Sequence, residues 1–197
     1  GWVERLRRLN LEPGQSGAVF YNLGVRGDGV AQVSQRLDHE FKHRGELRNR
    51  VPDVLVLSVG MNDSARVGNA LGRNYTDFDA FQTHIEALLS QARQMCPVLF
   101  IGMPPVNEAA MPFMEILHYS HGEQWRYREA TLQACMRNNI PYLDVLDMWL
   151  GRGEAWWGPR MSADGLHPNT AGYRALLNDI LAWDAFQVGI DLANSVS

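Results

Sequence analysis

The sequence predicts an α/β fold in which helices cover both faces of a parallel sheet. Short apolar runs bounded by turn residues, which are typical of buried strands, lie near residues 18–23, 53–59, 97–102 and 140–145. Stretches with helical spacing of apolar residues separate these runs. Strands that alternate with helices form a parallel sheet, because each crossover helix packs against one of its faces.

Three apolar stripes predict the helices. Their residues are Trp2, Val3, Leu6 and Leu9, then Val30, Val33, Leu37 and Phe41, then Phe78, Phe81, Ile85, Leu88, Leu89 and Ala92. Residues spaced three and four apart lie on one face of a helix, so we interpret the stripes as core. A last major helix is expected near 170–183.

Composition favours one soluble globular domain over residues 1–197, with 46% hydrophobic and 20% charged residues. The net charge of −4 argues against a nucleic-acid partner, because the chain has no basic face. The apolar runs are far shorter than the roughly 20 residues that cross a bilayer, so no membrane span is expected.

The cysteines and histidines predict no metal. Cys96 and Cys135 fit small buried hydrophobic positions, and the pairs His39/His43 and His118/His121 lack a third grouped ligand. Glycine-rich phosphate loops are also missing after the predicted strands, so no cofactor is expected. Two cysteines favour a reducing compartment such as the cytoplasm, while a signal peptide before Gly1 is left open.

The most informative stretch is Asp164-Gly165-Leu166-His167-Pro168-Asn169. An aspartate three residues before a histidine can orient the imidazole as a general base. The alternative is an ordinary loop that begins a helix, with Asn169 as its N-cap.

Two further stretches follow predicted strands. Gly60-Met61-Asn62-Asp63 comes after the run 54–59, and Asn22-Leu23-Gly24-Val25-Arg26-Gly27-Asp28 comes after 18–21. The carboxyl ends of parallel strands meet at the edge where ligands bind, and an Asn amide or Gly N–H delivered there can donate to an oxyanion. The alternative is turn chemistry, with Asp63 as a helix cap.

These stretches, in this order, resemble the SGNH or GDSL-type serine hydrolases, which are esterases and lipases. The resemblance extends from residue 1 to about 185. It implies a flavodoxin-like three-layer α/β/α sandwich and a small-molecule acyl ester as substrate. It also implies that Gly27 and Asn62 form the oxyanion hole and that Asp164 and His167 are the triad acid and base.

One block of that family is missing from the sequence, namely a first strand that ends in Gly-Asp-Ser. The chain begins instead with a helix much like the one that follows this strand. The serines considered as replacements are Ser16, Ser34, Ser58, Ser64, Ser90, Ser120 and Ser162. Ser58 and Ser64 lie nearest the expected site, but neither follows a first strand. We therefore expect the nucleophile on a segment upstream of Gly1.

The missing strand would be central to the sheet. Such a strand buries four or five apolar side chains at about 1.5–3 kcal/mol each, so its loss would cost on the order of 10 kcal/mol of stability. That is comparable to the whole stability of a domain, roughly 5–15 kcal/mol.

The alternative function is a non-catalytic binding or scaffold protein that lacks the nucleophile. The oligomeric state is left open.

The substrate is the least determined part. The loop Met103-Pro104-Pro105-Val106 leaves the same sheet edge and could line an acyl pocket, together with the apolar segment 111–117. The alternative is a packed loop beneath a helix. Trp156 and Trp157 could stack on a sugar or acyl chain, or cap the core. Short-chain esters, acylated sugars, lysophospholipids and thioesters all fit the resemblance.

Overall fold

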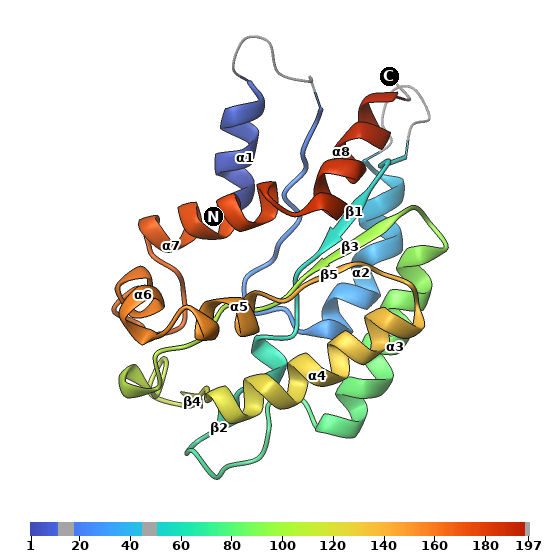
Figure 1. The fold of residues 1–197 in the computed structure, drawn as a ribbon. Coiled ribbons are helices and arrows are strands. Elements are labelled where there is room, and N and C mark those ends of the chain that lie inside the picture. The colour runs from blue at the N-terminus through green and yellow to red at the C-terminus, as the bar shows by residue number, and fades with distance from the viewer. Residues whose placement is uncertain (12–17, 45–50, 196–197) are drawn as a thin grey trace.

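The computed structural model describes residues 1–11, 18–44 and 51–195 and has helices on two sides of a sheet (Figure 1). The helices are α1 (Trp2–Asn10), α2 (Val30–Lys42), α3 (Phe78–Arg93), α4 (His121–Arg137), α5 (Val145–Gly151), α6 (Glu154–Trp157), α7 (Thr170–Leu181) and α8 (Asp184–Ser195), with short 3₁₀ turns η2 (Asn62–Ser64), η3 (Glu108–Ala110) and η4 (Gly158–Arg160). The strands are β1 (Leu55–Leu57), β2 (Arg66–Val67), β3 (Val98–Ile101), β4 (Leu117–His118) and β5 (Tyr142–Leu143).

The main sheet has the strand order β1-β3-β5, and both of its pairings are parallel. Val56 is opposite Leu99, and Phe100 is opposite Tyr142. The strands β2 and β4 form a separate antiparallel ribbon, in which Arg66 is opposite His118.

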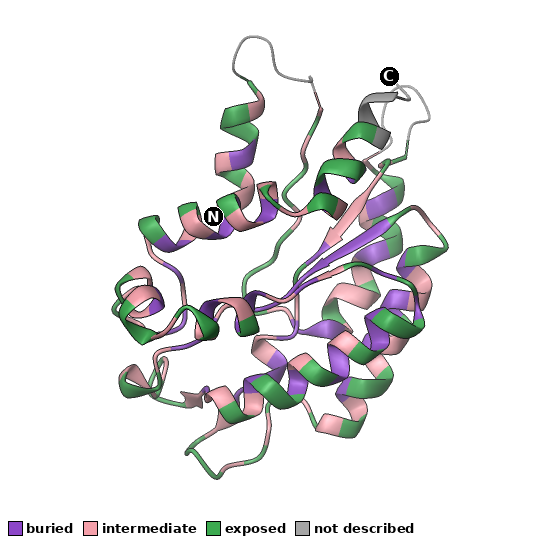
Figure 2. Cartoon of the chain, viewed as in Figure 1, coloured by how far each residue is buried: buried purple, intermediate pink, exposed green. Residues whose placement is uncertain are grey.

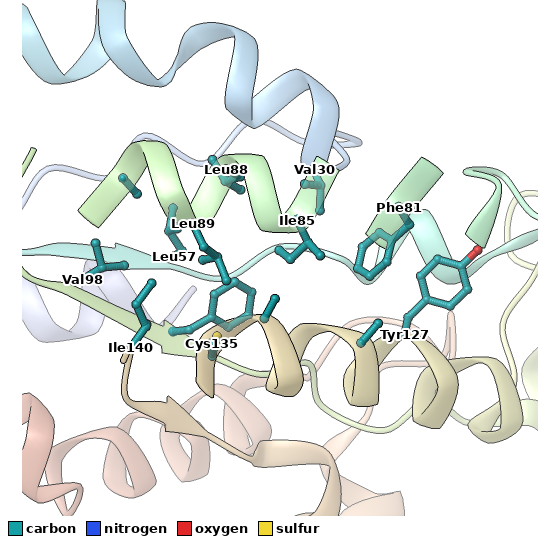
Figure 3. Packing of buried hydrophobic residues seen from close by; sticks show 14 of the residues in the cluster. Val30, Leu57, Phe81, Ile85, Leu88, Leu89, Val98, Tyr127, Cys135 and Ile140 are labelled. Carbon is teal, nitrogen blue, oxygen red and sulfur yellow. The ribbon is translucent and has the colours of Figure 1, made fainter. Parts of the chain in front are cut away.

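The central strand β3 defines the layers, because all four of its residues are buried. Val98 and Phe100 pack into a cluster with side chains of α2, α3 and α4, which Figure 3 shows from close by. Leu99 and Ile101 point to the opposite face, where they pack with side chains of α1, α5, α7 and α8. The predicted three-layer α/β/α sandwich with a parallel sheet is confirmed.

The predicted strands near 53–59, 97–102 and 140–145 are β1, β3 and β5, but the prediction of a strand near 18–23 is wrong. Residues 18–24 run as an irregular segment along the open side of β1 (Figure 1). A strand needs hydrogen bonds from a neighbouring strand. Within the described part of the chain, β1 pairs only with β3, so residues 18–24 are not hydrogen-bonded to it as a strand.

The side chains along this open edge are unusually accessible. Val19 is 74% exposed and Tyr21 is 45% exposed. Leu55 and Val56 of β1 are only partly buried, whereas β3 is buried throughout (Figure 2). The open edge, which we define as residues 18–25 together with β1, is therefore an incompletely covered part of the apolar core.

The core on the α3 face should dominate stability. Leu88 is fully buried there, so Leu88→Ala should lower the free energy of unfolding by about 2–5 kcal/mol through lost burial and the cavity that remains. Leu71, which is 92% exposed, provides the matched control, and Leu71→Ala should change it by less than about 0.5 kcal/mol. Urea denaturation measures both, and equal effects would contradict the assignment of the core.

Candidate active site

Loops from distant parts of the sequence meet beyond the carboxyl ends of the sheet. The loop after β3 holds the Asp164–His167 loop, because Asn107 N–H donates to the Gly165 carbonyl at 2.7 Å. Leu166, beside His167, is buried against Val106 and Ala65, and Met61, beside Asn62, packs against the same cluster. The structure thus brings the Asn62 turn and the Asp164–His167 loop to one region.

Asp164 and His167 form a hydrogen-bonded pair. The imidazole Nδ1 lies 2.8 Å from Asp164 Oδ2, while Asp164 Oδ1 accepts the backbone N–H groups of Leu166 at 2.9 Å and His167 at 3.0 Å. Burial raises the pKa of Asp164, but the hydrogen bonds from His167 and Leu166 outweigh it and lower this pKa below its ordinary value. The carboxylate therefore stays ionised and fixes the orientation of the imidazole.

The same loop also begins a helix, so the Asp–His pair and the helix start, which the sequence offered as alternatives, occur together. Asn169 is the N-cap of α7, since its Oδ1 accepts the N–H groups of Ala171 and Gly172. Gly165 has a φ of +70°, and a Cβ there would lie 2.6 Å from Ala110 Cβ. Glycine is required at this position by both the backbone conformation and the close approach.

Asn62 and the Gly27 loop are in direct contact. The Asn62 amide Nδ2 donates to the Asp28 carbonyl at 2.8 Å. Gly27 is exposed and has a φ of +85°, which favours glycine. Arg36 of α2 holds this loop, because it donates to the Leu23 carbonyl and to the Asp28 carboxylate, each at 2.8 Å. Arg36 was not predicted, because a single arginine on a helix gives no signal in the sequence.

Asp63 is a helix cap, as one interpretation of the sequence proposed, although the helix is a distant one. Its carboxylate is fully buried and accepts Val30 N–H, at the start of α2, at 3.1 Å. Thr76 Oγ1 donates to it at 2.7 Å. Burial raises the pKa of Asp63, while the hydrogen bonds from Thr76 and Val30 oppose that rise.

Most of the loop predicted to line a substrate pocket is packed inside. Met103, Pro105 and Val106 are buried, and Pro104 is partly buried. Gln124 of α4, itself fully buried, donates to the Pro104 carbonyl at 2.8 Å and accepts Val106 N–H at 3.2 Å. The packed arrangement describes this loop in the structure, and its contact with substrate stays a prediction.

An aromatic side chain from the neighbouring segment does reach the histidine. The ring of Phe113 lies edge-on to the His167 imidazole, with 5.7 Å between the ring centroids. The two tryptophans are engaged elsewhere: Trp157 is buried, and Trp156 contacts the guanidinium groups of Arg152 and Arg160. Phe113 therefore places an aromatic ring against His167.

The serines differ in their availability. Ser64 is buried, and its Oγ donates to the Met61 carbonyl at 2.8 Å. Ser58 is exposed just after β1, and no hydrogen bond joins it to His167 in the described part of the chain. Ser16 lies outside the described residues.

Residues 1–11, 18–44 and 51–195 also bear on three other features, namely a metal site, a reactive cysteine and a membrane span. No group of three potential metal ligands occurs there. Burial raises the pKa of the Cys96 thiol to about 11 and that of Cys135 to about 12, which disfavours thiolates. No helix in this part of the chain is long and apolar enough to cross a membrane. Two surface hollows lie elsewhere, one around Cys96 and one between α3 and α4.

The fold is a parallel α/β sheet, a class in which ligands bind at the carboxyl edge of the strands. The model of the GDSL-like lipase/acylhydrolase family matches residues 1–175, and the protein belongs to this family of ester hydrolases. Among curated proteins, no relative matches the sequence.

Solved structures share this fold. A lipase/acylhydrolase from Enterococcus faecalis is 20% identical, with a TM-score of 0.69 over 91% of this chain and 80% of that one. An α/β hydrolase enzyme from the metagenome of Lake Arreo, Spain, is 15% identical, with a TM-score of 0.71 over 92% and 80%. An acetylxylan esterase from Geobacillus stearothermophilus is 15% identical, with a TM-score of 0.61 over 81% and 69%.

The lowered pKa of Asp164 predicts how acid should affect stability. A carboxylate whose pKa is lower in the folded state stabilises the fold above its unfolded pKa of about 3.9, and this contribution is lost as the pH falls through the folded value. Asp164→Asn removes the titrating group. Urea denaturation between about pH 5 and pH 2 should therefore show a steeper loss of stability in the wild type than in the variant. Parallel pH profiles would contradict the lowered pKa of Asp164.

Proposed function

We propose that this chain supplies the base, the acid and two oxyanion donors of a carboxylic ester hydrolase that works by a Ser-His-Asp mechanism. The observation that carries the proposal is the Asp164–His167 pair, in which Nδ1 is held at 2.8 Å by the carboxylate. This bond fixes the tautomer in which Nε2 can accept a proton. The His167 side chain is 41% exposed, so Nε2 is accessible to a nucleophile.

In this mechanism His167 takes the proton from a serine hydroxyl as the serine attacks the ester carbonyl. Asp164 stabilises the imidazolium that forms, and His167 then returns the proton to the leaving alkoxide. Gly27 N–H and the Asn62 amide donate to the tetrahedral oxyanion. Water repeats the sequence on the acyl-enzyme, which releases the acid.

The nucleophile in this proposal comes from an extended segment that precedes Gly1 and lies along the open edge. The apolar side chains exposed there support the proposal, because an added strand would pair with β1 and cover Val19, Tyr21 and Val56. Its carboxyl end would bring a serine to the same sheet edge as Asn62.

The substrate in this proposal is an uncharged acyl ester. The apolar segment 111–117, with Phe113 against His167, supports an apolar group beside the base. The Geobacillus acetylxylan esterase shows that this fold serves acetyl esters, which is consistent with a short acyl chain. Pro104, the partly buried residue of the loop Met103-Pro104-Pro105-Val106, would form the floor of the acyl site.

The test is hydrolysis of p-nitrophenyl acetate and butyrate by the protein of the full natural reading frame. We expect activity in that protein, and none in its His167→Ala variant or in the 197-residue chain. Ser58→Ala in the full-length protein is the control and should retain activity. Activity that survives His167→Ala would reject the mechanism, and inactive, well-folded full-length protein would favour a non-catalytic scaffold.

The oxyanion role of Asn62 has its own test. Loss of one oxyanion donor costs about 2.7–4 kcal/mol in the barrier, so Asn62→Ala should lower kcat by roughly a hundred- to a thousandfold. Asn69→Ala, at an exposed loop position, should stay within about twofold of the wild type. Steady-state kinetics on the full-length protein measures both, and near-normal turnover of Asn62→Ala would reject its role.

A further inference from the structure

We infer that Asp63 is a positioning residue of the proposed oxyanion hole, because its buried carboxylate holds the Asn62 turn against the start of α2. This inference rests on the proposed function, since it assigns a role to the residue beside one oxyanion donor. Asp63 does not touch the substrate in this assignment. It acts through the two segments that carry Asn62 and Gly27.

The contacts of Asp63 join three parts of the chain. The carboxylate accepts Val30 N–H, at the first turn of α2, and the Thr76 hydroxyl, just before α3. The Asp63 carbonyl also accepts Thr76 N–H at 3.4 Å. Thr76 is itself fixed by Tyr127 of α4, whose hydroxyl donates to the Thr76 carbonyl at 2.5 Å. The η2 turn is thereby anchored to α2, α3 and α4.

Two hydrogen bonds connect the η2 turn with the Gly27 loop and the start of α2, and the turn donates one and accepts the other. Asn62 donates to the Asp28 carbonyl at 2.8 Å, and the neighbouring Asp63 accepts Val30 N–H at 3.1 Å. The Asn62 amide has two N–H groups, so one can donate to the oxyanion while the other keeps its bond to the Asp28 carbonyl. The bond from Val30 N–H to the Asp63 carboxylate is the second one that holds the two segments together.

Close packing makes this connection sensitive to small changes. A Cβ on Gly29 would lie 2.6 Å from Asp63 Oδ1, so the backbone approaches the carboxylate too closely for any side chain. Asp63 is fully buried, and water cannot replace its hydrogen bonds to Val30 and Thr76. Loss of the carboxylate should therefore shift the start of α2, and with it Gly27, relative to Asn62.

A shift of this kind should affect the transition state more than the ground state. Oxyanion donors act at the position of the developing charge, and a misplacement of about 1 Å can cost on the order of a hundredfold in rate. An ester carbonyl in the ground state depends much less on these donors. The expected signature is a lower kcat with a KM close to the wild-type value.

The experiment compares two variants of Asp63 in the full-length protein, at a temperature where thermal denaturation shows each to be folded. Asp63→Ala removes both acceptor oxygens and should lower kcat about 10- to 100-fold with KM within about threefold. Asp63→Asn should stay within about threefold in kcat, because its oxygen can accept Val30 N–H while its amide donates to the Thr76 hydroxyl.

The matched control removes a buried polar group far from the site. Asn138 follows α4 and donates to the Glu86 carboxylate at 2.7 Å, so Asn138→Ala should lower the thermal midpoint without changing kcat. If Asn138→Ala and Asp63→Ala lower kcat equally, Asp63 is merely structural and the inference fails. It also fails if folded Asp63→Ala keeps the wild-type kcat.

A double variant keeps the inference testable where Asp63→Ala does not fold. Thr76→Val should lower kcat only a few-fold while Asp63 keeps its bond to Val30. In Asp63→Asn the Thr76 hydroxyl must accept a hydrogen bond from the new amide N–H. Adding Thr76→Val removes that acceptor, so the double variant should lose the near-normal kcat of Asp63→Asn, by more than the product of the single effects. Additive effects would overturn the inference. Inactive wild-type protein would instead reject the proposed function.

Discussion

The parallel pairing of β3 with both β1 and β5 is the constraint on which the rest of the structure depends. The side chains of β3 alternate between two clusters, with Phe100 on the α3 face and Leu99 on the α7 face. A strand buried on both faces has to be apolar throughout, and helices have to cover each side. Because the strands are parallel, their carboxyl ends lie at one edge, and the loops that carry polar residues meet there.

Hydrogen bonds to backbone groups, rather than contacts between the candidate site side chains, bring these loops together. The Gly165 carbonyl accepts Asn107 N–H, which joins the loop of the Asp–His pair to the loop after β3. Gln124 satisfies two backbone groups of that same loop from inside α4. Buried polar groups of this kind are costly to leave unpaired, so they fix loop positions more strictly than apolar packing does. These hydrogen bonds therefore set the position of the loops on the His167 side.

The other side of the site is less complete. The Gly27 loop is held by Arg36, Asn62 and Asp63, but the residues before it run beside β1 without strand pairing among the described residues. Val19 and Tyr21 show that this segment keeps accessible apolar surface. The proposed oxyanion donors and the open edge are thus parts of one region, and the Gly27 loop depends on how the start of α2 is anchored.

The sequence by itself determined the helical stripes, the buried strands and the residue types of the site. Leu88, Phe100 and the pair Asp164–His167 were predictable because their signals are local: helical spacing, an apolar run and a three-residue interval. Tertiary structure decided what local signals do not contain. Residues 18–23 have strand composition but pair with no strand among the described residues, and Val106 of the predicted substrate loop is buried against Leu166. The buried face of α4 includes Gln124 and Thr131, so its periodicity is weak, and the partners of Gln124 and Asp63 lie far away in the sequence. Hydrogen bonds between distant segments form only when packing has removed water, which is why the fold alone determines them.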